Sequence, residues 1–344
     1  MPFAKSGLAA ALGAALLGSV AAQPAWAEDP GSVLLRQGMA APHTVSYVGQ
    51  LETVRFSSNR ANATIVRIWH LAPSMTRRWY LAPEGLYNDY TITRGSANYQ
   101  FDTKRSEVRV SRNPVLDDQV AAEDSLSRVL ANYRAIVAPG DIIAGRKTTS
   151  LVLVNKHTGE RVMRLWLDSQ THLVLKKEEY HGNGAVASET RFEELRYTSV
   201  IPTALFSTDA SGFAQVAGRD YATPTADVDR IIHEAGFTPI KPTNLPRGFA
   251  LAGGDVTTVN GVRTLHLTYS DGLRTLSLFE NASGAAADFG ALHPQPIQFE
   301  GHDAEYIEDG PTTLLTWKER GLSFALVGDL LRSELIEIAK SVVP

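Results

Sequence analysis

The sequence contains no cysteine at all. This absence excludes disulfides, thiolate zinc sites, iron–sulfur clusters and cysteine nucleophiles from a chain of 344 residues. A surplus of charge of one sign is also missing, because 33 basic and 37 acidic residues give a net charge of −4. A dedicated nucleic-acid-binding protein carries a basic surplus, so we expect no nucleic-acid partner.

The common catalytic and cofactor motifs are absent as well. There is no Gly-x-x-x-x-Gly-Lys-Ser/Thr phosphate loop, no Gly-x-Gly-x-x-Gly and no Gly-x-Ser-x-Gly nucleophile motif. His233-Glu234 begins like a zinc-protease helix, but Phe237 stands where the second histidine ligand would be. The nine histidines are scattered, with none paired at metal-binding spacing on a helix. We therefore expect neither a cofactor nor a metal, and no enzyme activity.

The first 27 residues have the composition of a secretory signal peptide. Leu8–Ala22 is an apolar run, and Ala25-Trp26-Ala27 is a small-x-small cleavage site. A membrane span needs about 20 apolar residues, which this run does not reach. We expect cleavage after Ala27 and a mature chain that works outside the cytoplasm, with an uncleaved anchor as the alternative.

Residues 28–206 have the pattern of a β-rich domain, not of alternating βα units. Apolar and polar residues alternate in short segments, which predicts antiparallel strands at 43–56, 63–71, 75–81, 98–101, 107–110, 142–144, 148–155, 161–168, 173–180 and 186–197. A short helix capped by Ser32 is expected at 33–39. A longer helix, capped by Asp117 or Asp118 and ended by Pro139-Gly140, is expected from a one-face pattern at Leu126, Val129, Leu130, Tyr133 and Val137.

A small, polar stretch at 207–223 is interpreted as a linker to a second domain at 224–344. A helix near 227–235 opens that domain. Two hairpins follow, with turns at Ser270-Asp271-Gly272 and Glu319-Arg320-Gly321. The chain closes with a helix whose apolar stripe is Leu331, Leu335, Ile338 and Val342. The sequence thus predicts an α+β fold with a second, smaller α+β domain.

Some strands of the first domain are apolar on both faces. In 161–168, Met163, Leu165 and Leu167 share one face, and Val162 and Trp166 the other. Such a strand fits a plain core under the helix at 126–137, or a half-open barrel around a lipid-like ligand. From the alternation alone, the candidate cavity residues are Trp69, Trp79, Met163, Leu165 and Leu167.

Basic residues gather in one part of the first domain. They are either solvated strand faces or a surface for an acidic partner or anionic lipid, and comprise Arg67, Arg77, Arg78, Lys104, Arg105, Arg109 and Arg112.

Two segments resemble known families. Leu165–Tyr180, with Gly184 and Phe192 beyond it, resembles the strand–turn–strand of LolA-like lipoprotein-carrier domains. A later segment resembles the C-terminal domain of the RseB/MucB family of sigma-E regulators, and comprises Leu245-Pro246-Arg247-Gly248-Phe249, His266–Leu273 and Leu276–Phe279.

This resemblance implies a LolA-like half-open antiparallel β-barrel wrapped on helices, followed by the smaller domain. It also implies a non-enzymatic periplasmic protein that binds the periplasmic part of a single-span anti-sigma factor. Binding would protect that factor from proteolysis and so control an envelope-stress sigma factor, with lipid or lipoprotein sensed in the half-barrel. The alternative is a LolA-type lipoprotein or lipid carrier, against which the second domain counts. Whether the chain forms a homo-oligomer is left open by the sequence.

Overall fold

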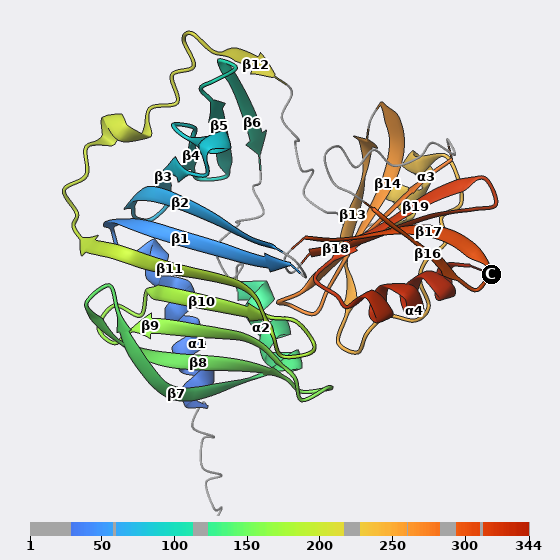
Figure 1. Ribbon diagram of the computed structural model, residues 1–344, viewed down its shortest axis with the longest axis horizontal. Coiled ribbons are helices and arrows are strands. Elements are labelled where there is room, and N and C mark those ends of the chain that lie inside the picture. The colour runs from blue at the N-terminus through green and yellow to red at the C-terminus, as the bar shows by residue number, and fades with distance from the viewer. Residues whose placement is uncertain are drawn as a thin grey trace, which may run out of the picture.

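The protein folds into two sheets of unequal size (Figure 1). The structure, a computed structural model, describes residues 29–57, 60–112, 123–216, 228–259, 261–282, 294–309 and 312–343. Within these ranges, one sheet has twelve strands and the other has seven. The expected α+β class is confirmed, and in the described part of the chain the large sheet stays open between its edge strands β12 and β7. The expected signal segment at 1–27 lies outside the described residues.

The large sheet follows the predicted series of strands except at β4, β12 and most of β7, where no strand was predicted, and neighbours in the sequence mostly pair antiparallel. Its strand order is β12-β6-β5-β4-β3-β2-β1-β11-β10-β9-β8-β7. The strands are β1 (Tyr47–Ser57), β2 (Arg60–Leu71), β3 (Met75–Ala82), β4 (Tyr90–Arg94), β5 (Ala97–Asp102), β6 (Glu107–Arg112), β7 (Tyr133–Ile143), β8 (Arg146–Asn155), β9 (Arg161–Asp168), β10 (Val174–Tyr180), β11 (Val186–Tyr197) and β12 (Ala214–Val216). Strand β12, inside the expected linker at 207–223, pairs with β6 in parallel.

The helix expected to run from Leu126 to Val137 is wrong in its second half. Helix α2 (Glu123–Asn132) ends at Asn132, and β7 begins at Tyr133. Because Ile136 and Val137 are β-branched, they fit a strand, and pairing with β8 decides the competition. Strand β7 lies at the edge of the sheet, where a proline such as Pro139 is tolerated. The expected caps Asp117 and Asp118 lie outside the described residues.

The N-terminal helix α1 (Pro30–Ala40) is confirmed, with a different cap from the one expected. Asp29 caps it, and its carboxylate accepts a hydrogen bond of 3.0 Å from the backbone N–H of Ser32. A 3-10 turn, η1 (Ala41–His43), follows directly. The helix lies close to the sheet because Gly38 has no side chain: a Cβ there would lie 2.6 Å from Leu167 Cδ2.

The two faces of the large sheet are covered differently. Helices α1 and α2 pack on one face through Leu35, Leu126 and Val129, over a core that includes Leu151 and Leu165. On the opposite face, strands β4 to β6 bury Ile92, Phe101 and Val108 under the segment that contains Ile201 and Phe206. The rest of that face, on β10 and β11, carries ion pairs: Lys176 pairs with Glu178 of its own strand at 2.9 Å and with Glu189 of β11 at 3.0 Å.

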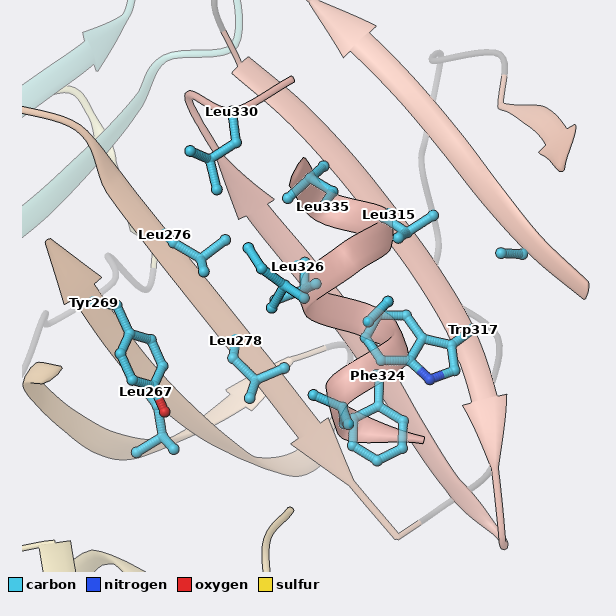
Figure 2. Packing of buried hydrophobic residues seen from close by; sticks show 14 of the residues in the cluster. Leu267, Tyr269, Leu276, Leu278, Leu315, Trp317, Phe324, Leu326, Leu330 and Leu335 are labelled. Atoms are coloured by element: carbon cyan, nitrogen blue, oxygen red, sulfur yellow. The ribbon is translucent and has the colours of Figure 1, made fainter. Parts of the chain in front are cut away.

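The small sheet has the order β13-β14-β15-β19-β18-β17-β16. Its strands are β13 (Ala250–Val259), β14 (Val262–Ser270), β15 (Thr275–Asn281), β16 (Gln295–Phe299), β17 (His302–Asp309), β18 (Thr312–Glu319) and β19 (Leu322–Gly328). Helices α3 (Val228–Ala235) and α4 (Arg332–Val342) contribute Ile231 and Leu335 to one shared core. Figure 2 shows this core, with Leu335 of α4 above the leucines of β15, β18 and β19. Both predicted hairpins and the predicted terminal helix are confirmed.

No helix in the described ranges combines the length and the apolar character that crossing a bilayer demands.

Candidate functional site

An apolar groove lies on the helix-covered face of the large sheet, where α1 and η1 meet the strands. Its wall includes Leu51 of β1, Ile68 of β2, Leu175 of β10 and Phe192 of β11. Met39 and Pro42, at the end of α1 and in η1, complete the apolar lining. Such a concave apolar surface is what a small apolar ligand or an acyl chain occupies in proteins.

Backbone features shape this groove. A register shift between Gln50 and Leu51, opposite β11, marks an irregularity of the kind that bends a strand. Next to it, a Cβ on Gly49 would lie 2.4 Å from the carbonyl oxygen of Glu194, so only glycine allows the strands to approach this closely. The curvature of the sheet at the groove therefore depends on this glycine and on the shift beside it.

His70 is buried in the groove wall and has a partner on each ring nitrogen. Its Nε2 donates to the carbonyl oxygen of Pro42 at 2.7 Å, so its Nδ1 accepts from the Thr76 hydroxyl at 2.8 Å. The ring also stacks on Tyr47, with centroids 4.9 Å apart. Burial lowers the pKa of His70, the Pro42 carbonyl opposes this, and the charges of Arg78 and His43 lower it further. A neutral His70 thus fastens η1 to the sheet.

Cations also line the groove, from strands β3 and β10. They are Arg78 and Lys177, and Lys177 pairs with Glu179 at 3.0 Å. An apolar lining with cations beside it is complementary to an amphipathic ligand that has an apolar chain and an anionic head.

The five candidate cavity residues named from the sequence do not come together. Trp69 and Trp79 lie on the opposite face with their rings stacked 6.5 Å apart, and Trp69 packs against the core of Ile92 and Phe101 whereas Trp79 is exposed. Met163, Leu165 and Leu167 lie in the core beneath α1 and α2. None of the five lines the groove.

On β2, the groove residue that the sequence reasoning missed differs from its choice by a single step of register. Ile68 directly precedes Trp69, and neighbouring residues of a strand point to opposite faces. The groove face of β2 is Val66, Ile68 and His70, all buried. The signal that could have found it is the pairing of Tyr47 with His70 across β1 and β2, which places both rings on one face.

The basic segment does not form a single surface. Arg77 donates to the carbonyl oxygen of Leu205 at 3.0 Å and lies over the Tyr90 ring, whereas Arg78 lines the groove on the other face. Arg105 pairs with Asp102 in its own turn at 3.1 Å. The side chain of Arg112 lies outside the described residues.

One group of side chains in the small sheet resembles a catalytic triad. His266 Nδ1 lies 3.3 Å from Asp255 Oδ1, and its Nε2 lies 3.0 Å from Ser277 Oγ. A serine nucleophile also needs hydrogen-bond donors for the oxyanion. Strand β15, which carries Ser277, is paired on both sides with β14 and β19, so its backbone N–H groups are engaged in the sheet. We therefore assign this group no acyl-transfer role, and the described residues contain no cluster of three metal-ligating side chains.

Two open sheets, with an apolar groove on the larger one, define a two-domain binding protein. The chain belongs to the MucB/RseB family: the family model of the MucB/RseB N-terminal domain matches residues 35–210, just over half of the chain. The model of a domain of unknown function, DUF4367, matches residues 239–342. Comparison with curated proteins found no significant match.

Solved structures of MucB share the fold over both domains. MucB in complex with MucA(peri) is 17% identical, with a TM-score of 0.62, over 91% of this chain and 97% of that one. The MucA/MucB complex of Pseudomonas aeruginosa is 17% identical, with a TM-score of 0.63, over 92% and 98%. MucB crystallised alone gives 17% identity and a TM-score of 0.53, over 90% and 96%. The likeness therefore includes the small sheet as well as the large one.

Proposed function

We propose that this chain is a periplasmic regulator that binds the periplasmic part of a single-span anti-sigma factor. By covering that segment it protects the factor from proteolysis and so controls an envelope-stress sigma factor. The observation that carries the proposal is membership of the MucB/RseB family, together with a fold shared over both domains with MucB in complex with MucA(peri). The function needs binding alone, which agrees with the absence of catalytic motifs from the sequence.

The proposal includes how the chain is organised. A signal peptide at 1–27 is removed after Ala27, residues 28–206 form the first domain, 207–223 the linker and 224–344 the second domain. Export of the chain would place both domains on the same side of the membrane as the periplasmic part of the partner.

We further propose that the groove binds a lipid or the acyl part of a lipoprotein, and that this binding relieves the regulation. The apolar lining at Leu51, Ile68 and Phe192 supports an acyl chain, and Arg78 and Lys177 support an anionic head group. The same groove favours a second candidate function, a LolA-type carrier of lipoprotein or lipid. A carrier would need only the large sheet, whereas the likeness to MucB extends over both sheets.

The test is a pull-down of the mature chain, residues 28–344, from envelope extract, with mass spectrometry of proteins and lipids. We expect a single-span protein with a cytoplasmic anti-sigma domain, retained in stoichiometric amount and cleaved more slowly by protease when bound. Lipid or lipoproteins without that protein would support the carrier instead. The mass of the purified chain in solution, measured by light scattering, will determine whether it is a homo-oligomer.

The groove is tested separately with a fluorescent fatty acid. Leu51→Trp fills the groove and should weaken fatty-acid binding at least tenfold. Trp79→Leu removes an aromatic ring from the opposite face and should leave binding unchanged. Equal affinity in both variants would exclude the groove as the lipid site.

A further inference from the structure

The turn between β14 and β15, residues 271–274, is inserted into the domain of the large sheet. Gly272 has a φ of +106°, and a Cβ there would lie 2.6 Å from the backbone nitrogen of Val129 in α2. Leu273, the next residue, packs against the core beneath α1 and α2. The two sheets therefore share a packed junction at this turn.

Asp271 anchors the turn and is fully buried. Its Oδ2 accepts from the Tyr133 hydroxyl at 2.5 Å and from Arg274 Nε at 3.1 Å. Its Oδ1 accepts from the backbone N–H groups of Leu273 and Arg274 at 3.1 and 2.8 Å. Asn132, at the end of α2, donates to the backbone carbonyl of Asp271 at 2.9 Å. Each carboxylate oxygen of Asp271 thus has its hydrogen-bond partners within the closed junction.

A second contact beside the turn is not satisfied in this way. A pocket there is lined by Glu179 and Gly182 from the large sheet and by Asp329 and Leu331 from the small one. The contact is close, since a Cβ on Gly182 would lie 2.6 Å from Leu331 Cδ1. Two carboxyl groups, Glu179 and Asp329, therefore face this pocket from opposite sides of the junction.

The cations around these two carboxyl groups are already engaged. Lys177 pairs with Glu179 at 3.0 Å, and the Ser188 hydroxyl also donates to Glu179. Arg274 is held by Asp271 and, at 3.8 Å, by Glu334. Asp329 accepts only a 3.3 Å hydrogen bond from the Thr312 hydroxyl among the described side chains.

The remaining charged groups that line the pocket belong to the large sheet. They are Glu160, His181 and Arg161, and Arg161 lies over the Tyr180 ring at 3.7 Å. No ion pair between any of these groups and Asp329 is formed within the described ranges. A charged Asp329 therefore stands opposite another carboxylate, and the nearby cations Lys177 and Arg274 are paired with other carboxylates.

We propose that the junction is a pH-sensitive latch, in which protonation of Asp329, opposite the Glu179 carboxylate, holds the two sheets together and ionisation of Asp329 loosens them. This inference goes beyond the proposed function and does not depend on it. The Asp271 turn anchors the closed junction, and the pocket beside it supplies the pH response. Opening the junction separates the two carboxyl groups and exposes Asp329 to water.

The direction of the response follows from the protonation of Asp329. Burial raises its pKa to about 6, and the charge of Glu179 raises it as well, while Thr312, Lys177 and Arg274 oppose the change. When the junction opens, this pKa returns towards its ordinary value of 3.8. Because the closed form binds the proton more tightly, closure is favoured at low pH and weakened as the pH rises through 6. The equilibrium constant for opening should rise about tenfold between pH 5 and pH 7.

Hydrogen exchange on the mature chain tests this latch. The backbone amides of Leu273 and Arg274 belong to the turn that packs against α2 and its core, and they become accessible to exchange when the junction opens. Corrected for the intrinsic pH dependence of exchange, their opening constant should be about tenfold smaller at pH 5 than at pH 7. The amides of β15 exchange when the small sheet itself unfolds. Their exchange therefore distinguishes unfolding of the small sheet from opening of the junction.

Three variants complete the test. Asp329→Asn should make the opening constant independent of pH between 5 and 7, and Glu179→Gln should reduce the dependence. Asp303→Asn removes an exposed carboxylate from the same sheet and should preserve the tenfold change. Equal opening constants at both pH values in the unaltered chain, or an unchanged pH dependence in Asp329→Asn, would overturn the proposal.

Discussion

Each of the two sheets buries a titratable side chain, and the two should respond to pH in opposite directions. His70 of the large sheet has a lowered pKa, because burial disfavours its charged form. Glu280 of the small sheet is fully buried, and burial raises its pKa to about 7, opposed by a hydrogen bond from the backbone N–H of Ile240. Burial favours the neutral form of both groups, which is the deprotonated form of a histidine and the protonated form of a carboxyl.

The stability of the two sheets should therefore change with pH in opposite senses. The contribution of His70 is fully present above its ordinary pKa of 6.5 and is lost as the pH falls below that value. The contribution of Glu280 is fully present below its ordinary pKa of 4.5 and is lost as the pH rises through about 7. The large sheet and the small sheet should therefore be most stable at different pH values.

The largest effect should come from the two hydrophobic cores. Leu278→Ala in the small sheet and Leu151→Ala in the large sheet each remove a fully buried side chain. Each should lower the free energy of unfolding of its own sheet by about 2–5 kcal/mol, through lost burial and the cavity left behind. Denaturant unfolding followed by tryptophan fluorescence checks this, since Trp317 lies in the small sheet and Trp166 in the large one. If both variants shift both signals equally, the sheets unfold as one unit and their stabilities cannot be compared separately.

Glu280→Gln should remove the loss of stability that the small sheet undergoes as the pH rises. At pH 8 the replacement avoids burying a charge whose oxygens have a partner only in the Ile240 N–H, at 3.0 and 3.2 Å, among the described residues. We expect a gain of about 1–3 kcal/mol at pH 8 and little change at pH 5, measured by denaturant unfolding at both pH values. Glu305→Gln, at an exposed position of the same sheet, is the control. A gain that is the same at both pH values would show that the charge of Glu280 is not the cause.

His70→Gln tests whether His70 causes the expected loss of stability of the large sheet as the pH falls. At pH 7.5 it should cost the large sheet about 1–2 kcal/mol, because the hydrogen bonds to Pro42 and Thr76 are altered. It should also remove the loss of stability as the pH falls, followed by thermal unfolding between pH 8 and 5. His43→Gln, at an exposed histidine nearby, should keep that loss. An acid loss that survives in His70→Gln would assign it to other groups.

The smallest effect should come from the charged face of β11. Arg191 pairs with Glu193 and, at 3.6 Å, with Glu52, but its side chain is 45% exposed. Because solvent screens exposed pairs, Arg191→Gln should change the free energy of unfolding by less than about 0.5 kcal/mol. Denaturant unfolding at low and high salt checks this. A loss above 1 kcal/mol would mean that this face stabilises the sheet as the cores do.

The strands were accessible from the sequence because alternation directly reflects a sheet with two different faces. The long helix was not, because Leu126, Val129 and Tyr133 fit a helical face whether the chain continues as a helix or turns into β7. Helix α2 ends at Asn132 because the residues from Tyr133 onward pair with β8 as strand β7, a pairing that the one-face pattern does not reveal.

The groove could be predicted only in part for a similar reason. The sequence showed that strands such as 161–168 are apolar on both faces, and the structure accounts for this by a core on one side. On the other side Trp166 lies between Arg164 and Lys176, which cover it with their charged side chains. The groove itself is made where α1 ends, and no local pattern in the sequence shows which strand face that end covers.

The most direct test of the central claim is a calorimetric titration at pH 7. The mature chain, residues 28–344, is titrated with the periplasmic part of a single-span anti-sigma factor from the same organism. A regulator of the MucB/RseB family should give saturable binding, and the bound segment should resist a protease that cleaves it when free. A folded chain that produces no binding heat and leaves the segment equally sensitive to the protease would contradict the proposed function.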